Sequence, residues 1–475
     1  MKVSVLYFSC HQLLGAPMKS YGKNQHFLSH NGVGNYHKRK HKSKFNPAVT
    51  IRAAFSSSPS LGSSASDYSE NVINEQVKKK RSSIAGIDQD ELLDPRNLAD
   101  PDSCFCEFKG VDIHYKVCEA QPSMLEEPKA SQLDDPNMKL GFPMIFLHGF
   151  GASTFSWHRV MMPFAQRTCS KVLAFDRPAF GLTSRVSHLG HSNDDTRPLN
   201  PYSMAFSVLA TLYFIDFLKS EKAVLVGHSA GSLTAVEAYF EAPDRVAALI
   251  LVAPAIIAPL SATKENKSDK ENQAQKSSDE PQNLLSKLGQ VLSKFYRYIA
   301  NTIMHVLKGI MNVVSFVYTK AIVAILRSAI AKIFVRMIID KFGIAAVKNA
   351  WYDVNQVTDH ILHGYTKPLR TKDWDRALVE YTVAMLTDPQ AKLKPPLKNR
   401  LQNIACPVLI ITGDGDRLVP SWNSERLSRV IPGSQLEVIK NCGHLPHEEK
   451  PEEFVSIVAN FLQKVFAGSE LCWQA

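Results

Sequence analysis

The sequence predicts an α/β protein in which a mostly parallel central sheet has helices on both faces and is interrupted by a helical insertion. Short, nearly continuous apolar segments alternate with helix-like segments through much of the chain, as expected for parallel strands that are buried on both faces. A Gly-x-Ser-x-Gly motif directly follows one of these strands and precedes a helical segment. The alternation stops between Pro254 and about Lys392, which marks the insertion.

The N-terminal segment has the composition of an organellar transit peptide. Its first 66 residues contain nine Lys or Arg, no Asp or Glu, and many Ser near the end. We predict a transit peptide over 1–53, cleaved after Ala53, and a chloroplast location, either in the stroma or peripherally on a plastid membrane. Mitochondrial import is the less favoured alternative, and a disordered basic tail is a third interpretation.

The formal net charge of +10 comes from two segments. Besides the N-terminus, residues 284–350 contain ten Lys or Arg and one acid, Asp340. Without the transit peptide the chain is close to neutral, so charge gives no support to a nucleic-acid partner. The eight cysteines include no Cys-x-x-Cys pair, and we expect neither a metal nor a cofactor.

The expected elements follow in chain order. Residues 54–103 are polar, and we predict a disordered linker there. The N-terminal part of the core, 104–254, then begins with a β-hairpin that turns at Lys109-Gly110. Its C-terminal part covers 392–466. Further strands are expected at 143–147, 171–175, 223–226, 247–252, 407–411 and 435–439, and helices at 204–218 and 232–240.

The insertion, 255–391, is predicted to form a helical cap. Residues 261–283 are almost without apolar side chains and are expected to be a disordered loop. Residues 284–350 have apolar residues at helical spacing, which predicts a helical hairpin or bundle. The apolar run over 309–319 is only 11 residues long before Lys320 interrupts it. A membrane-spanning helix needs about 20 mostly apolar residues, so this run is too short for one.

The Lys and Arg residues of the cap lead to two hypotheses about its partners. At about 100° per residue they scatter around a helical wheel, which disfavours a single interfacial helix, although several short helices would still expose a basic, apolar surface. One hypothesis is peripheral membrane contact, in which the cap docks on anionic plastid lipid and admits an apolar ester. The alternative is a cap that packs on the core with its basic side chains solvated.

The motif Gly227-x-Ser229-x-Gly231 predicts a nucleophilic serine. Small residues two positions either side of the serine are required for a sharp turn from strand to helix. Ser229 would then stand at a helix N-terminus, where backbone N–H groups favour developing negative charge.

A serine nucleophile requires a base and an orienting acid, and both residue types follow in the expected chain order. Asp416 lies just after an apolar strand, and His444 lies in the loop after the next strand. Asp414 competes with Asp416 as the acid. His447 competes with His444 as the base, but the proline before it and the acids after it favour a surface turn.

With these motifs the chain resembles the α/β-hydrolase superfamily over about 104–254 and 392–466. His148-Gly149-Phe150-Gly151 is similar to the oxyanion loop of that family. The resemblance implies that the N–H groups of Phe150 and Ala230 form the oxyanion hole. The loops around Asp416 and His444 are similar to the acid and histidine loops of the family.

The segment 176–183 resembles a turn that is common in epoxide-hydrolase-like members, with Ala179 in place of a glycine and Thr183 in place of a serine. Those enzymes and the haloalkane dehalogenases use an aspartate nucleophile, whereas position 229 is Ser, which argues against both activities. The pattern also resembles that of pheophytinase-like plastid esterases.

The resemblance implies a serine hydrolase, and we expect a carboxylic-ester hydrolase that acts on an apolar small molecule or lipid through an acyl-enzyme on Ser229. Thioester hydrolysis, carbon–carbon bond hydrolysis and hydroxynitrile lyase chemistry fit the same residues. A hydrolase-fold receptor or scaffold without significant turnover is an alternative of a different class.

Overall fold

The structure is a computed structural model of the chain that describes residues 83–120, 140–186, 199–258, 284–388 and 394–466. The predicted transit peptide over 1–53, the first part of the predicted linker and the predicted loop over 261–283 lie outside the described residues. Those predictions therefore stay predictions.

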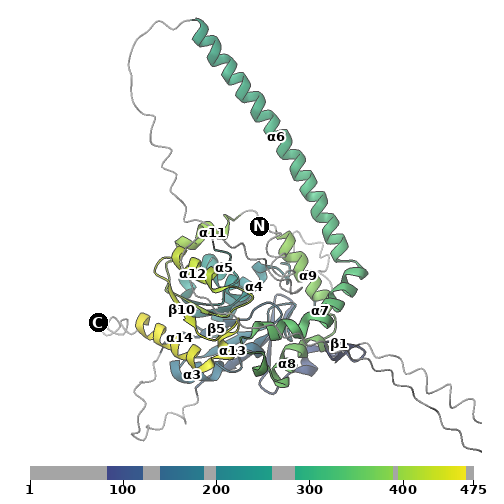
Figure 1. The fold of residues 1–475 in the computed structure, drawn as a ribbon, viewed down its shortest axis with the longest axis vertical. Helices are drawn as coiled ribbons and strands as arrows, with labels where there is room; N and C mark the ends of the chain where they lie inside the picture. Colours follow the sequence, from purple (N-terminus) through teal and green to yellow (C-terminus); the bar gives the residue numbers. More distant parts are fainter. Residues whose placement is uncertain (1–82, 121–139, 187–198, 259–283, 389–393, 467–475) are drawn as a thin grey trace, which may run out of the picture. The chain divides into compact units, whose positions relative to one another are not determined.

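A sheet forms the centre of the fold (Figure 1). It has eight strands in the order β10-β9-β8-β7-β5-β6-β4-β3. β4 pairs antiparallel with both β3 and β6, and every other neighbouring pair is parallel. The strands are β3 (Cys104–Phe108), β4 (Val111–Cys118), β5 (Met144–Leu147), β6 (Val172–Phe175), β7 (Ala223–His228), β8 (Val246–Val252), β9 (Val408–Gly413) and β10 (Gln435–Ile439). The predicted α/β class, its mostly parallel sheet and its N-terminal hairpin are confirmed.

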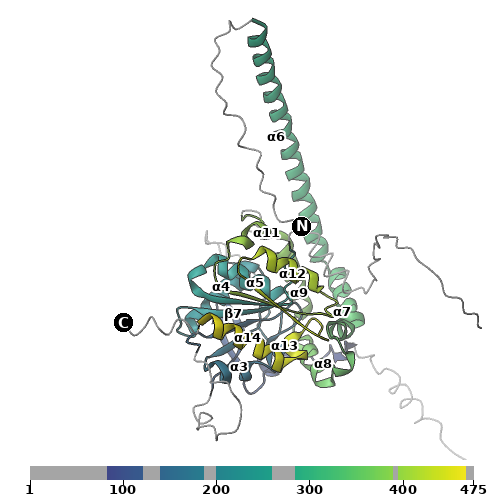
Figure 2. The same cartoon turned by 60° about the vertical axis from the view of Figure 1, so that its left-hand side comes forward.

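Helices cover both faces of the sheet (Figure 2). One face packs against α4 (Met204–Phe217), α5 (Ala230–Glu241) and α12 (Ser421–Val430), and the other against α3 (Met161–Thr168) and α14 (Pro451–Phe466). The short α11 (Leu397–Arg400) precedes β9, and α13 (Pro446–Glu449) precedes α14.

The strand sequences explain this two-sided core. In β5, Ile145 and Leu147 belong to one apolar cluster, whereas Met144 and Phe146 belong to the other. Side chains alternate between the faces of a strand, so a strand covered on both faces requires an unbroken apolar sequence. All four side chains of β5 are fully buried.

The parallel strands place the predicted site residues at one edge of the sheet. Ser229 follows β7, Asp416 lies three residues after the end of β9, and His444 lies in the loop after β10. The loop that begins at His148 follows β5. In parallel α/β sheets the edge at the carboxyl ends of the strands is the usual place for an active site.

The predicted disordered linker is wrong for residues 83–103. A two-stranded hairpin, β1 (Ser83–Ile84) and β2 (Ile87–Asp88), is followed by a short 3-10 helix, η1 (Pro95–Leu98). Ile84 and Ala85 pack against Trp374 of the cap. The Ala85 N–H donates to Asp340 Oδ1 at 2.8 Å. Contacts with the cap therefore order a segment whose composition predicts a linker.

The helical insertion between β8 and β9, called the cap below, contains α6 (Leu284–Leu326), α7 (Ala329–Ala350), α8 (Asp359–Thr366) and α9 (Trp374–Thr387). α7 packs against α9, and Arg336 of α7 pairs with Asp375 of α9 at 2.7 Å. Arg327, at the break between α6 and α7, bonds both carboxylate oxygens of Glu380.

Residues 284–326 form one continuous helix of 43 residues, which runs through Lys320. Within it, Ser293–Leu326 is long and apolar enough to cross a membrane by length and composition alone, so the expectation that the apolar segment is too short to span is wrong. Its most apolar part has a mean hydropathy of 1.8, and no residue of that part is buried.

Candidate active site

Ser229 lies at a strained turn between β7 and α5, as the motif predicts. Its φ of 51° and ψ of −114° place it in a region that non-glycine residues rarely adopt. Its N–H donates to the Val252 carbonyl at 2.9 Å, and its own carbonyl accepts from the Ala255 N–H at 3.2 Å. These bonds from the end of β8 hold the strained backbone in place.

Both motif positions must be glycine for steric reasons. A Cβ on Gly227 would lie 2.6 Å from the Gly231 carbonyl oxygen, and a Cβ on Gly231 would lie 2.1 Å from the Leu147 carbonyl oxygen. The backbones of β7, α5 and β5 therefore approach one another too closely for any side chain at either position.

Asp416 and His444 are in direct contact. His444 Nδ1 lies 2.7 Å from Asp416 Oδ2, and both side chains are buried. Asp416 Oδ1 accepts from the N–H groups of Leu418 and Val419, each at 2.8 Å. These two bonds fix the carboxylate so that its other oxygen faces the imidazole.

The structure distinguishes the two competing acids. Asp414 accepts from the Cys442 N–H at 3.4 Å and lies 4.0 Å from the Lys440 ammonium. Its carboxylate therefore interacts with the start of the His444 loop, whereas Asp416 contacts the imidazole itself.

The expectation that His447 lies in a surface turn is wrong, because its side chain is fully buried. The centre of its ring lies 4.2 Å from the ring centre of Trp157 and 4.7 Å from that of His228. Neither of its ring nitrogens has a hydrogen-bond partner among the residues that the structure describes. Without a carboxylate in hydrogen-bond contact, His447 lacks the orienting acid that His444 has.

The loop after β5 lies beside the nucleophile. A Cβ on Gly149 would lie 3.3 Å from Ser229 Cβ and 2.9 Å from His228 Nδ1. This proximity places the predicted donor Phe150 next to the serine, and Ala230 is the first residue of α5.

A buried arginine, which the sequence analysis did not identify as functional, holds this loop. The Arg177 guanidinium donates to the carbonyls of His148 at 3.0 Å and Gly149 at 3.4 Å. The Arg177 N–H donates to His148 Nε2 at 3.0 Å, and His148 Nδ1 donates to the Gly149 carbonyl at 2.7 Å. Both ring nitrogens of His148 therefore take part in hydrogen bonds that fix the loop.

Aromatic side chains of the core and the cap meet next to this loop. Phe150 is 44% exposed, and its ring lies 5.4 Å from Phe180 and 6.0 Å from Tyr381 of α9. Phe180 and Tyr381 are themselves 4.9 Å apart. Phe150 therefore packs against a buried aromatic cluster that the core and the cap share.

The turn after β6 is organised around a second buried His–Asp pair. His114 Nδ1 lies 2.7 Å from Asp176 Oδ2, and the two carboxylate oxygens also accept from the N–H groups of Thr154 and Leu182. Burial alone would raise the pKa of Asp176, but His114, His148 and the Leu182 N–H lower it to about 2. Ala179 has a φ of 82°, which explains the glycine of the related turn.

Ser103 completes a second Ser–His–Asp arrangement, because its Oγ lies 2.9 Å from His114 Nε2. This serine precedes the edge strand β3, and its Oγ accepts from the Asp100 N–H at 3.0 Å. It has neither the helix N-terminus nor the strained turn that Ser229 has. Ser103 therefore provides a natural control for any test of nucleophilicity.

The end of α7 connects the two loops that carry Asp416 and His444. The His444 N–H donates to the Ala350 carbonyl at 2.7 Å, and the Arg417 guanidinium donates to the carbonyls of Trp351 at 3.2 Å and Tyr352 at 3.3 Å. The sequence gives no signal for this contact, because residues 350–352 carry no recognisable motif.

Glu449 joins two of these segments, the end of α7 and the loop of His444. Its carboxylate accepts from the N–H groups of Tyr352 at 2.8 Å, Gly443 at 2.9 Å and Leu445 at 3.4 Å. Burial raises the pKa of Glu449, although these N–H groups oppose the shift. One buried carboxylate thus fixes the loop of His444 against the cap.

The histidines around His444 are held neutral. Burial lowers the pKa of both His148 and His447 to about 3, with Arg177 adding to the effect at His148, and it lowers that of His228 well below its usual value. His228 Nε2 donates to the His444 carbonyl at 2.9 Å. The immediate surroundings of His444 therefore add no competing imidazolium.

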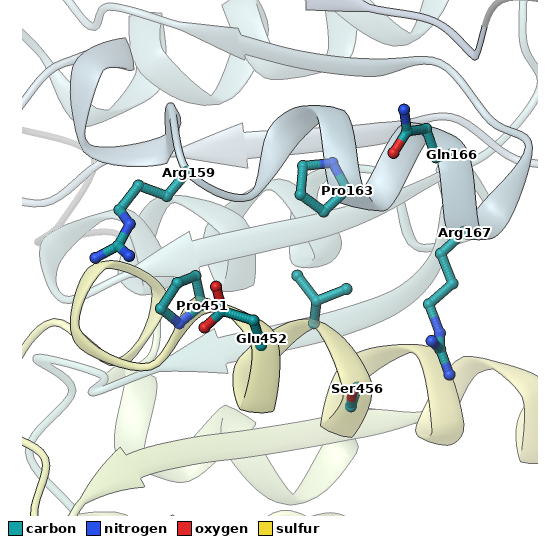
Figure 3. A pocket seen from close by; sticks show the side chains of 8 residues that line it. Arg159, Pro163, Gln166, Arg167, Pro451, Glu452 and Ser456 are labelled. Atoms are coloured by element: carbon teal, nitrogen blue, oxygen red, sulfur yellow. The ribbon is translucent and has the colours of Figure 1, made fainter. Parts of the chain in front are cut away.

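A hollow of ≈350 Å³ lies between α3 and α14 (Figure 3). Side chains of both charge signs line it, among them Arg159 and Glu452 (Figure 3). None of the predicted site residues is among the residues that line it. Within the described part of the chain, no group of three or more His, Cys, Asp or Glu could hold a metal ion.

Comparisons with known proteins agree with this fold. A family profile described as alpha/beta hydrolase fold matches residues 143–451, which include Ser229, Asp416 and His444. The uncharacterized hydrolase YugF of Bacillus subtilis (strain 168) is 20% identical over 331 residues, which are 67% of this chain and 89% of that protein.

Two further similarities are more limited. A 2-hydroxy-6-oxononadienedioate/2-hydroxy-6-oxononatrienedioate hydrolase of Pseudomonas putida is 44% identical over 69 residues, which are 14% of this chain and 24% of that protein. The crystal structure of Cfl2 from Burkholderia cenocepacia superposes with a TM-score of 0.49 at 15% sequence identity. The match covers 76% of this chain and 98% of the Cfl2 chain.

Proposed function

Because the chain belongs to the α/β-hydrolase family, we propose that it is a serine hydrolase that cleaves a carboxylic ester of an apolar small molecule or lipid. The observation that carries this proposal is the contact of Asp416 with His444 at the edge of the sheet where the strained Ser229 stands. This combination supplies a nucleophile, a base and an orienting acid.

In the proposed reaction, Ser229 Oγ attacks the ester carbonyl while His444 accepts its proton. Asp416 accepts a hydrogen bond from Nδ1 of His444, which leaves Nε2 as the basic atom, and it stabilises the imidazolium that forms. His444 then donates the proton to the departing alcohol. Water, activated by the same imidazole, hydrolyses the acyl-enzyme.

The negative charge that develops on the substrate oxygen is stabilised by the N–H groups of Phe150 and Ala230. The N-terminal position of Ala230 on α5 supports this role, because unpaired N–H groups and the helix dipole favour an anion there. Arg177 supports it indirectly, since it holds the carbonyls of the loop that carries Phe150.

The exposed ring of Phe150, which packs against the buried rings of Phe180 and Tyr381, supports an apolar acyl or alcohol group as the part of the substrate next to Ser229. Such a surface binds hydrocarbon by area and gives little discrimination between chain lengths. We therefore expect several apolar esters to be turned over.

Carbon–carbon bond hydrolysis of a keto acid is a second candidate. The observation that favours it is the local 44% identity with the Pseudomonas putida hydrolase. Its substrate carries carboxylates, which the apolar ring of Phe150 would not bind well.

The test is labelling with a fluorophosphonate probe, followed by a substrate panel of apolar esters, thioesters and keto acids. We expect covalent labelling that Ser229→Ala abolishes and Ser103→Ala leaves unchanged. Labelling that survives Ser229→Ala, or that is lost with Ser103→Ala, would contradict the assignment of the nucleophile. Turnover of keto acids but not of esters would favour the second candidate.

A further inference from the structure

α6 has a polar stripe along one side. From the point at which its side chains are described, a polar residue recurs every three or four positions. These residues, the polar stripe, are Lys294, Arg297, Asn301, His305, Lys308, Asn312, Ser315 and Thr319. At about 100° per residue they fall within an arc of about 80°. Three of the basic residues of α6 lie in this stripe, whereas Lys320 lies outside it.

The opposite side of α6 is apolar and exposed. This apolar face consists of Phe295, Tyr296, Ile299, Ile303, Val306, Leu307, Ile310, Val313, Val314 and Val317, whose side chains are 41–75% exposed. Singly exposed apolar residues are normal in proteins, but a contiguous apolar surface of this length marks a binding site. At 1.5 Å per residue the whole helix is about 65 Å long.

α7 continues this surface with a second apolar stripe. Ile330, Ile333, Phe334 and Met337 recur at helical spacing and are all more than half exposed. Val335 and Ile339 of the same helix pack toward Trp374. α7 is therefore attached to the cap by one side and presents apolar side chains on another.

The charge of both helices points to an anionic partner. The only acid in residues 284–350 is Asp340, and its Oδ1 accepts a hydrogen bond from Ala85. We propose that α6 and the exposed stripe of α7 bind the surface of a bilayer that contains anionic lipid. The apolar face enters the acyl region, and the polar stripe lies along the headgroups.

The arrangement of polar residues favours a helix that lies in the interface over one that spans the membrane. A spanning orientation would bring Asn301, Lys308 and Asn312 into the hydrocarbon, where buried charge and unpaired amides are costly. An orientation parallel to the surface keeps the whole stripe in contact with water and headgroups. A nucleic acid would bind the Lys and Arg residues through its phosphates and would leave the apolar face exposed to water.

Vesicle flotation of the full chain tests the proposal. We expect flotation with vesicles of phosphatidylcholine and phosphatidylglycerol, and weaker flotation with phosphatidylcholine alone or at high salt. Ile310→Gln combined with Val317→Gln, on the apolar face, is expected to weaken binding at least about tenfold. The matched pair Asn312→Gln and Ser315→Gln, on the polar stripe, is expected to bind as wild type does.

A charge variant tests the other half of the proposal. Replacing Lys294, Arg297 and Lys308 by Gln is expected to weaken binding to the anionic vesicles by about fivefold per charge, and to change binding to phosphatidylcholine little. Circular dichroism confirms that each variant is folded. Ser229→Ala is expected to bind vesicles like wild type, so failure of this proposal is distinguishable from failure of the proposed reaction.

Three outcomes would overturn the proposal. The first is equal binding by the apolar-face variant and wild type. The second is a stable dimer that does not bind vesicles, which would make a second copy of the chain the partner of the apolar face. The third is bound protein that resists extraction with alkaline carbonate, because a helix lying in the interface is released by that treatment and a spanning helix is retained.

Discussion

Replacing Gly443 with alanine should separate the loop of His444 from the cap. A Cβ at this position would lie 2.4 Å from the Ala350 carbonyl oxygen and 2.7 Å from the Tyr352 nitrogen. Both neighbours are backbone atoms, so no side-chain rotation relieves the contact. Because real Cβ atoms do not approach other atoms below 3.0 Å, the two segments must move apart by at least about half an ångström.

The expected loss follows from the hydrogen bonds that this movement strains. The His444 N–H donates to the Ala350 carbonyl, and the Gly443 N–H donates to Glu449. A buried donor that loses its partner costs about 1–3 kcal/mol, and the bond to the carboxylate lies at the upper end of that range. We expect Gly443→Ala to lower the free energy of unfolding by about 2–5 kcal/mol.

Activity should fall as well, because the displaced loop carries the proposed base. A shift of about 1 Å in a catalytic group costs on the order of a hundredfold in rate. The assay is kcat/KM on an apolar ester, together with urea denaturation followed by circular dichroism.

Gly343→Ala is the matched control. Its Cβ would meet only the Ile339 Cγ2 at 3.5 Å, an ordinary contact. Alanine inside helix α7 should be neutral or stabilising by up to about 1 kcal/mol. If Gly443→Ala matches this control in both stability and rate, the contact between the His444 loop and the cap does not support the site.

Three further predictions concern the buried charges. Asp416→Asn should lower kcat by about 10³–10⁴, because it disturbs the imidazole tautomer. Arg177→Met should lower kcat with little change in KM, because it frees the carbonyls of the oxyanion loop. Burial raises the pKa of Glu448 to about 8, from an ordinary value of 4.5. In the folded protein this carboxyl therefore stays protonated to a higher pH than in the unfolded chain. Its contribution to the free energy of unfolding is fully present below pH 4.5 and is lost as the pH rises toward 8. Glu448→Gln should flatten that decline, which amounts to a few kcal/mol between these pH values.

Each of these predictions has a control. Asp414→Asn should leave kcat near the wild-type value, and an equal loss in both variants would contradict the choice of Asp416. Arg429→Met, on the surface of α12, should change neither kinetic constant. For pH dependence, denaturation curves at several pH values are compared with those of Glu437→Gln, an exposed position on β10. A decline that persists in Glu448→Gln would rule out this carboxyl as its origin.

The sequence predicts the sheet well because strand burial leaves a local pattern. A strand such as β8 (Val246–Val252) is apolar at every position, and all seven residues are buried. The nucleophile turn is equally local, since its two glycines lie two residues either side of Ser229. The order of Ser229, Asp416 and His444 along the chain identifies the acid and the base, which the Gly-x-Ser-x-Gly motif alone does not.

Two of the wrong predictions concern contacts between distant parts of the chain. The proline and acids around His447 favour a turn in water, but Trp157 and His228 bury that turn. Residues 83–103 are polar enough for a linker, but their order depends on Trp374. For α6, Lys320 interrupts the apolar run without interrupting the helix, and its ammonium lies 5.5 Å from the centre of the Phe316 ring.

The distant contacts also explain why the insertion belongs to the proposed site. Ala350 ends α7, and its carbonyl receives the His444 N–H, while the next two carbonyls receive the guanidinium of Arg417. The loops that carry the acid and the base are thus joined through the cap as well as through the imidazole. Because α7 also bears the exposed apolar stripe, one helix connects the proposed lipid-binding surface to the loop of His444. On the proposed membrane surface, a lipid ester would lie beside the helix that supports the loop of His444.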